Sequence, residues 1–316
     1  MLDWTDRFYR YFARQISRRV YLYTEMVTTG ALIHGDAARF LRFEACEHPL
    51  ALQLGGSEPE ALARCARMAS DWGYDEVNLN VGCPSERVQS GAFGACLMAE
   101  PMLVADCLKA MQDAADIAVT VKHRIGIDAI EAYEFVEDFV GQVHRRSGCS
   151  VFIVHARNAI LKGLSPKENR DIPPLKYDYV HRLKQAFPTL EIHINGGFTH
   201  WEQIESQWDA VDGVMVGREA YHNPWLLAEA DRRAWGERAD PPTRRAVAEA
   251  MATFAAEQVA QGVPLKTLTR HILGLYQGQP GARQWRRMLS DHRRLQANDP
   301  GLILEASDAV EHRRAA

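Results

Sequence analysis

Short runs of apolar residues recur along the first two thirds of the chain, and segments with helical spacing of apolar residues separate them. The runs are rich in Val, Ile and Leu and are bounded by Gly, Pro or charged residues, which is typical of buried strands. Strands that are apolar on both faces and are each followed by a helix indicate a parallel sheet. The pattern predicts seven strands at 21–27, 50–54, 76–81, 118–122, 151–155, 191–195 and 213–216.

Seven strand and helix repeats in a chain of 316 residues predict an α/β protein of the (β/α)₈ TIM-barrel type. A closed barrel needs an eighth strand before the segment near Thr5, so we expect the first barrel strand to be missing at the N-terminus. The alternative is a doubly wound sheet. A dinucleotide-binding sheet of that type normally carries a Gly-x-Gly-x-x-Gly turn, and this sequence has none. We therefore expect a barrel domain over 1–235.

The remainder of the chain has a different pattern. A charged segment with two prolines, 232–243, predicts a linker, and 245–262, 265–277 and 282–295 have helical patterns. We expect a small all-helical domain over 243–316, with a fraying tail from about 298.

Charge is distributed unevenly between these two parts. The formal net charge is −4, yet the window 262–294 carries seven Lys or Arg residues and one acidic residue. A local basic face in an acidic protein suits a polyanionic partner. The residues that we expect to contact it are Arg283, Arg286 and Arg287.

Composition narrows the protein class further. The six cysteines form no Cys-x-x-Cys pair, so we expect reduced thiols and neither a zinc site nor a disulfide framework. No apolar stretch approaches the roughly 18 residues of a membrane span, and the N-terminus lacks the apolar core of a signal peptide. We expect a cytoplasmic protein, acting as a monomer, with no membrane partner and no metal.

The segment 78–85, which leaves the third predicted strand, carries the most informative chemistry. Gly82 and Pro84 end the strand and fix its exit, so Cys83 is directed beyond the strand's C-terminal edge. Active sites of barrels lie at that edge. We therefore interpret Cys83 as a candidate acid rather than a buried structural thiol.

Two short glycine-containing pairs, Gly196–Gly197 and Gly217–Arg218, follow the sixth and seventh predicted strands. Glycines at Gly196, Gly197 and Gly217 would let backbone amides approach a phosphate, and Arg218 would add charge; Asn195 precedes the first pair. With the first barrel strand missing, these two predicted strands correspond to strands seven and eight of a complete barrel. The loops after strands seven and eight commonly hold phosphate in this fold. The spacing predicts a phosphate site.

Other strand ends carry polar residues that need partners. Lys122 ends a central strand, where burying an ammonium without an anion is costly. Gln53 and Asn80 also lie at strand ends, and their amides could pair with a ligand's donors and acceptors. An anionic ligand with hydrogen-bond donors and acceptors of its own would satisfy this set.

Several ordered motifs span about 220 residues of the chain. They are LDWTDR (2–7), YTEMVTTG (23–30), NLNVGCPS (78–85), TVKHRIG (120–126), 155–157, GLSPKENRDIPP (163–174), INGGF (194–198) and 216–218. Together they resemble the tRNA-dihydrouridine synthases, and the long run at 163–174 resembles their A subtype. Several motifs in order make this signal far stronger than any single pattern.

The resemblance implies a flavoenzyme in which NADPH reduces bound FMN and a uridine of the tRNA D loop becomes 5,6-dihydrouridine. It implies that Cys83 protonates C5 of the base and that Lys122 stabilises negative charge at the N1 and O2 edge of the flavin. It also places His155 against the flavin and Met1 over it. The A subtype implies uridines 20 and 20a.

The resemblance and the loop positions also give candidate RNA contacts. Arg157 leaves the strand beside His155, Arg124 follows the flavin lysine by two residues, and a long loop comes next. The candidate contacts are Arg124, Arg157, Lys162, Ser165, Lys167 and Asn169.

Two other functions fit parts of this pattern. An FMN barrel acting on a free pyrimidine, similar to dihydroorotate dehydrogenase, would not need the basic helices. A noncatalytic tRNA-binding protein would leave Cys83 and Lys122 without a purpose. The family usually opens with an apolar strand ending in Pro-Met before a segment like 2–7, so we expect the native protein to begin at least about ten residues upstream of Met1.

Overall fold

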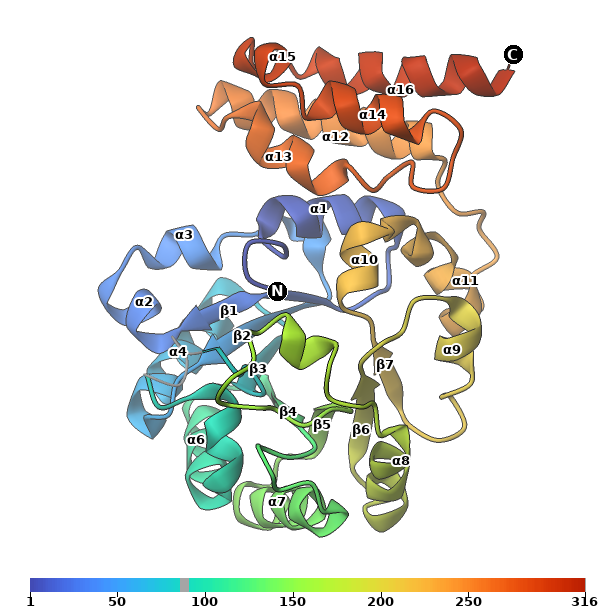
Figure 1. Ribbon diagram of the computed structural model, residues 1–316. Helices are drawn as coiled ribbons and strands as arrows, with labels where there is room; N and C mark the ends of the chain where they lie inside the picture. The colour runs from blue at the N-terminus through green and yellow to red at the C-terminus, as the bar shows by residue number, and fades with distance from the viewer. Residues whose placement is uncertain (86–90, 316) are drawn as a thin grey trace. The chain divides into compact units, whose positions relative to one another are not determined.

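The computed structural model describes residues 1–85 and 91–315, and within them seven strands form one sheet in chain order (Figure 1). Neighbouring strands from β2 to β7 pair in parallel, and helices follow the strands along the chain. The predicted α/β barrel architecture is confirmed, and each predicted strand lies within two residues of an observed one. The strands are β1 Leu22–Thr28, β2 Leu50–Gly55, β3 Glu76–Val81, β4 Ala118–Arg124, β5 Val151–His155, β6 Glu191–Asn195 and β7 Gly213–Met215.

The strand β3 shows why an apolar run with alternating polar residues becomes a barrel strand. Val77, Leu79 and Val81 are fully buried on one face, because side chains of a strand alternate between its two sides. The opposite face carries Glu76, Asn78 and Asn80, which hydrogen-bond to side chains of β2 and β4. The interior of the sheet is therefore polar along this strand.

Helices cover the outer side of the curled sheet (Figure 1). In α4 the residues Leu62, Cys65, Ala66 and Ala69 are buried, and Gly73 ends the helix with φ 85°, where a left-handed residue favours glycine. The helices of this part are α2 Thr29–His34, α3 Ala37–Leu41, α4 Pro59–Trp72, α6 Pro101–Ala114, α7 Tyr133–Ser147, α8 Tyr177–Ala186 and α9 Trp201–Glu205, with short 3₁₀ helices η2 Gly94–Ala99 and η3 Glu168–Arg170.

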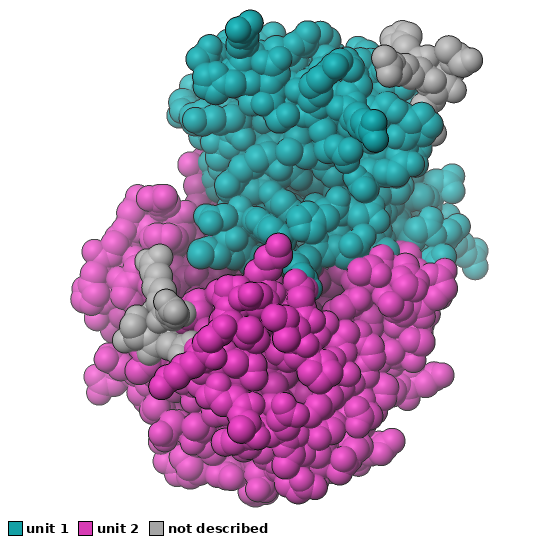
Figure 2. Space-filling view, in the orientation of Figure 1, with its two compact units in different colours: residues 1–22, 43–47, 218–316 teal, residues 23–42, 48–217 magenta. Residues whose placement is uncertain are grey.

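The chain forms two compact units, coloured separately in Figure 2. Unit 2 comprises residues 23–42 and 48–217 and holds the sheet, whereas unit 1 comprises 1–22, 43–47 and 218–316. The predicted domains, 1–235 and 243–316, remain a prediction. Unit 1 is built from α1 Arg7–Ile16, η1 Ala45–Glu47, α10 Arg218–His222, η4 Pro224–Glu229, α11 Ala230–Trp235, α12 Arg244–Ala260, α13 Leu265–Ile272, α14 Ala282–Leu289, α15 His292–Gln296 and α16 Gly301–Ala315.

The N-terminal helix α1 belongs to unit 1 because its contacts are with the C-terminal helices. Asp6 caps the helix by accepting from the backbone N–H groups of Phe8 and Tyr9, at 3.0 and 3.1 Å. Arg7 donates from Nη2 to Oε1 of Gln258 in α12 at 2.6 Å. Segments far apart in sequence thus make one helical unit.

Two expectations for the C-terminal region were wrong. The segment 282–295 is two helices, because the Asp291 carboxylate caps a new helix by accepting from the backbone N–H of Arg293 at 2.9 Å. The expected fraying tail is instead α16, in which Ile303, Ala306 and Val310 are fully buried. Apolar residues spaced three and four apart form that buried stripe.

Candidate active site

The polar residues at the ends of β2, β3 and β4 lie on neighbouring strands in matched register. Gln53 pairs with Asn78, and Asn80 pairs with Lys122. Partners in parallel strands direct their side chains to the same face, so the structure brings these predicted site residues together inside the sheet.

Cys83 lies on the turn that follows β3, as predicted. The Asn80 carbonyl Oδ1 accepts from the backbone N–H of Gly82 at 3.1 Å and from that of Cys83 at 2.9 Å, which holds the turn in one shape. The thiol is free and half-buried, and its Sγ lies 3.5 Å from Oγ of Ser85. A partly exposed thiol at the C-terminal edge of the sheet can reach a substrate.

Lys122 is half-buried at the same edge, and its Nζ has no hydrogen bond or ion pair with the residues described, 1–85 and 91–315. Desolvation lowers the pKa of its ammonium to about 7, and the nearby Arg124 guanidinium contributes to that shift. An anion placed here would recover the cost of burying that charge.

Arg124, a predicted RNA contact, is buried and connects three loops. Its Nε donates to the Gly82 carbonyl at 3.1 Å, and its Nη1 donates to the carbonyls of Asn158 and Asn169 at 3.1 and 3.0 Å. Desolvation lowers its pKa to about 10. The geometry makes Arg124 an organiser of the loops around Cys83, and a role toward RNA remains a prediction.

Asn169 has a similar organising role. Its side chain is fully buried, accepts from the Ile160 N–H at 2.7 Å and donates to the Ile160 carbonyl at 2.8 Å. A substrate has no exposed surface of Asn169 to contact. The same loop presents exposed residues that a substrate could reach, namely Lys162, Ser165 and Lys167.

His155 and Arg157 leave β5 side by side, as the sequence predicts. His155 is a register partner of both Arg124 and Asn195, and it is buried. The Arg157 guanidinium donates to the carbonyls of Pro173 and Asp171 in the loop that follows. Both residues therefore lie at the same edge as Lys122.

The glycines after β6 are required by the backbone. Gly196 and Gly197 have φ values of 127° and 77°, which disfavour any side chain. A Cβ on Gly197 would lie 2.6 Å from Cδ1 of Leu175, and one on Gly196 would lie 3.0 Å from Cδ2 of His155. Leu175 and His155 can pack this closely against the backbone only because Gly196 and Gly197 carry no side chain.

The other predicted phosphate residues lie after β7. Gly217 ends unit 2 and Arg218 begins α10 in unit 1, where Met1 also lies. Their placement against the glycines of β6 remains a prediction.

The predicted basic surface lies on α14 in unit 1. Trp285, Met288 and Leu289 are buried, which leaves Arg283 and Arg287 exposed and Arg286 half-exposed. These arginines line a hollow of about 680 Å³ together with residues 277–279. A concave, arginine-rich surface suits a phosphate backbone.

The sequence reasoning missed three residues that connect to the site. Asn78, Thr120 and Glu76 are buried and continue the hydrogen bonds of Gln53 into the barrel. A signal was present, since polar residues at 76, 78 and 80 alternate with the apolar ones of a buried strand.

The described residues show neither a metal-binding cluster nor a membrane-spanning helix. No group of His, Cys, Asp or Glu within 1–85 and 91–315 could hold a metal ion. In the same part of the chain, no helix is long and apolar enough to cross a membrane.

Comparison with solved structures gives the fold class. A mutant of morphinone reductase, solved in complex with tetrahydroNAD, superposes with a TM-score of 0.50 at 12% identity over 78% of this chain and 86% of that chain. This likeness shows the fold, a barrel of parallel strands covered by helices.

The family follows from sequence comparison. The dihydrouridine synthase family model matches residues 1–311, and the chain belongs to this family. A tRNA-dihydrouridine(20/20a) synthase of Pseudomonas aeruginosa is 59% identical over 290 residues, covering 92% of this chain and 87% of that protein. The protein of the same name from Escherichia coli K12 is 54% identical over 314 residues, covering 99% and 91%.

Proposed function

We propose that this protein reduces uridine in the D loop of tRNA to 5,6-dihydrouridine at positions 20 and 20a, with FMN as cofactor and NADPH as reductant. The observation that supports it most is Lys122, an ammonium with no anionic partner among the described residues, beside the strand that presents Cys83. A reduced flavin is an anion that would meet that ammonium. The names of the relatives give the substrate and its positions.

The residues present fit FMN. Its phosphate would approach the bare backbone of Gly196 and Gly197, and its ring would lie against the amides of Gln53 and Asn80. No dinucleotide motif favours FAD. The proposed FMN-binding residues are Met1, Gln53, Asn80, Lys122, His155, Asn195, Gly196, Gly197, Gly217 and Arg218.

Bound FMN, reduced by NADPH, would supply the hydride that C6 of the base receives, and a proton added at C5 would complete the saturation of the C5–C6 bond. Cys83 holds the proton that C5 receives, at Sγ, on a turn that Asn80 keeps fixed. Arg124 fixes the carbonyl of Gly82 next to that thiol. An extruded nucleotide would contact the loop 162–167 and Arg157 on entry, since a base must leave its stack to reach such a pocket.

The tRNA itself would be held by the arginines of α14, and its A-form and loop shape would be read through phosphate contacts. Unstacking a base costs about a few kcal/mol, which those contacts would offset. With tRNA as its substrate, the protein would work in the cytoplasm.

Replacing Cys83 tests the chemistry. Cys83→Ala should lower single-turnover dihydrouridine formation by about 10² to 10⁴, because general acid catalysis contributes that much. NADPH should still bleach the flavin. Cys96→Ala, which removes another half-buried free thiol, is the matched control and should retain modification. Equal rates in both variants would make Cys83 structural.

The cofactor is tested by denaturing the purified protein and identifying the released flavin. FMN is expected. A folded protein that cannot be reconstituted with FMN would exclude the proposal, and reduction of a free pyrimidine at the same rate as tRNA would favour the dihydroorotate dehydrogenase-like alternative.

The substrate surface is tested by salt dependence. Neutralising Arg283, Arg286 and Arg287 together should flatten the slope of log Kd against log salt by roughly one unit per lost phosphate contact. NADPH oxidation should change little. Neutralising Arg64 and Arg67 of α4 is the control, and an unchanged slope in the α14 variant would remove this surface from the proposal.

A further inference from the structure

A chain of hydrogen bonds runs through the interior of the sheet from the Cys83 turn to Glu76. Asn80 donates from Nδ2 to Oε1 of Gln53 at 2.9 Å, and Gln53 donates from Nε2 to Oδ1 of Asn78 at 2.9 Å. Asn78 then donates from Nδ2 to Oγ1 of Thr120 at 2.7 Å, and the Thr120 hydroxyl donates to Oε1 of Glu76 at 2.6 Å. All five side chains belong to unit 2.

The two ends of the chain have fixed roles. At one end, the backbone N–H groups of Gly82 and Cys83 can only donate, and they require Oδ1 of Asn80 as their acceptor. At the other end, Oε1 of Glu76 accepts from Thr120 and also from the Tyr23 hydroxyl at 2.9 Å. A carboxylate oxygen without a proton can only accept.

Fixed ends determine the orientation of every amide between them. An amide has a donor end and an acceptor end, and in isolation it can be turned over at little cost. Turning over Asn80 here would set its NH₂ against two N–H donors, and turning over Gln53 or Asn78 would create the same kind of conflict with the next residue. In a buried chain each conflict leaves an unsatisfied polar group.

The register of the strands maintains this arrangement. Gln53, Asn78 and Thr120 are register partners across β2, β3 and β4, so their side chains form one layer. Asn78 is fully buried and Thr120 is 2% exposed, which excludes water as an alternative partner.

We propose that Glu76, Thr120 and Asn78 are positioning residues, which fix the donor and acceptor faces that Gln53 and Asn80 present to the flavin and hold the turn of Cys83. The inference rests on the proposed function for the identity of the ligand. It adds three residues that do not touch that ligand and act through the two amides that do.

The sharpest test compares two threonines. Thr120→Val is nearly isosteric and removes the hydroxyl that links Asn78 to Glu76, whereas Thr120→Ser keeps it. Thr269→Val is the matched control, because Thr269 is also buried, at 1% exposed, and lies in α13 of unit 1, outside the hydrogen-bonded chain.

Three measurements on the full chain report on the positioning. Thr120→Val should raise the Kd for FMN about 3- to 10-fold, the value of one hydrogen bond, and should shift the visible absorption of bound flavin. It should also change the rate at which iodoacetamide alkylates Cys83, followed on the Cys83 peptide by mass spectrometry. Thr120→Ser should keep all three readouts near wild type, and Thr269→Val should leave them at wild-type values.

The outcomes separate this inference from the proposed function. Thr120→Val matching Thr269→Val in Kd, spectrum and alkylation rate would overturn the positioning role. A wild-type protein that binds FMN and leaves tRNA unmodified would remove the proposed function, and the threonine comparison would still decide the positioning. If wild-type protein bound no FMN, the Cys83 alkylation rate would decide it alone, with equal rates overturning it.

Discussion

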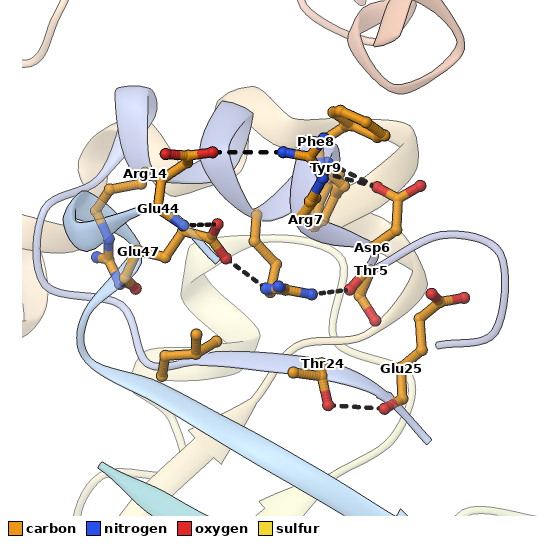
Figure 3. Close-up of polar contacts among 12 residues, drawn as sticks. Thr5, Asp6, Arg7, Phe8, Tyr9, Arg14, Thr24, Glu25, Glu44 and Glu47 are labelled. Atoms are coloured by element: carbon orange, nitrogen blue, oxygen red, sulfur yellow. Dashed lines mark hydrogen bonds and ion pairs between the residues drawn. The ribbon is translucent and has the colours of Figure 1, made fainter. Parts of the chain in front are cut away.

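Two glutamates are buried in the described chain, one in each unit, and their partners differ in charge. Glu47 in unit 1 accepts at Oε2 from Nε of Arg10 at 2.5 Å and at Oε1 from the Glu44 N–H at 2.8 Å (Figure 3). Glu76 in unit 2 accepts at one oxygen from the neutral hydroxyls of Thr120 and Tyr23.

Burial raises the pKa of both carboxyl groups, and the partners oppose that shift. At Glu47 the opposing group is a full positive charge that is itself buried. At Glu76 the hydroxyls would still donate to Oε1 if the other oxygen took a proton. The comparison indicates that Glu47 stabilises unit 1 through its ion pair with Arg10. Glu76 instead fixes the orientation of the hydroxyl groups that donate to it.

Removing the positive charge that faces Glu47 should have the largest effect on stability. Arg10→Met should lower the free energy of unfolding by about 3 to 5 kcal/mol, because an uncompensated carboxylate stays buried. Urea denaturation measures the loss. The double variant Arg10→Met with Glu47→Leu should recover most of the lost free energy of unfolding. A single Arg10→Met variant as stable as wild type would mean that the ion pair contributes nothing to stability.

The sequence predicted the architecture because strands buried on both sides are locally recognisable. All seven predicted strands are present in the structure. Cys83, Lys122 and the glycines after β6 lie at strand ends, which a parallel sheet places at one edge. Residues whose roles depend on distant partners could not be found in this way. Nothing local in 7–16 indicates that α1 contacts α12 and α13.

The site shows the same limit at the level of single residues. Arg124 and Asn169 have side chains that could contact RNA. In the structure both are buried and hydrogen-bond to backbone groups of the surrounding loops. A linear sequence does not show which backbone groups lie near a side chain. The hydrogen-bonded chain was partly visible in the polar alternation of β3. Its continuation through Thr120 needed the register of β4.

Lys122 extends the comparison to a half-buried cation that has no carboxylate partner among residues 1–85 and 91–315. The folded pKa of Lys122, about 7, is below its unfolded value of 10.5, so the unfolded chain binds the extra proton between these values and stability rises with pH there. At pH 7 and below, flavin-free Lys122→Met should therefore be more stable than wild type by about 1 to 3 kcal/mol.

The same variant should bind FMN more weakly, since it lacks the charge that meets the flavin. Thermal denaturation of the flavin-free proteins at several pH values and FMN titration measure both effects. A variant that is less stable at pH 6 and binds FMN unchanged would show that Lys122 is a structural residue with a partner of its own.

The smallest expected effect concerns Glu76→Gln, which keeps an acceptor oxygen for Thr120 and Tyr23 and removes the titration. The folded pKa of Glu76 is raised above 4.5, so the stability from holding its proton is complete below about pH 4.5 and is lost as pH rises through the folded pKa. Wild type should lose about 1 kcal/mol relative to Glu76→Gln over that rise, while the Kd for FMN stays within about 2-fold, less than one hydrogen bond. The charges of His193 and Glu191, which form an ion pair at 2.7 Å, also affect the pKa of the Glu76 carboxyl. Glu191→Gln is therefore the control for their contribution.

If Glu76→Gln instead raised the Kd for FMN as much as Thr120→Val does, the negative charge of Glu76 would be the property that the site requires. The distinction between Glu76 and Glu47 would then fail.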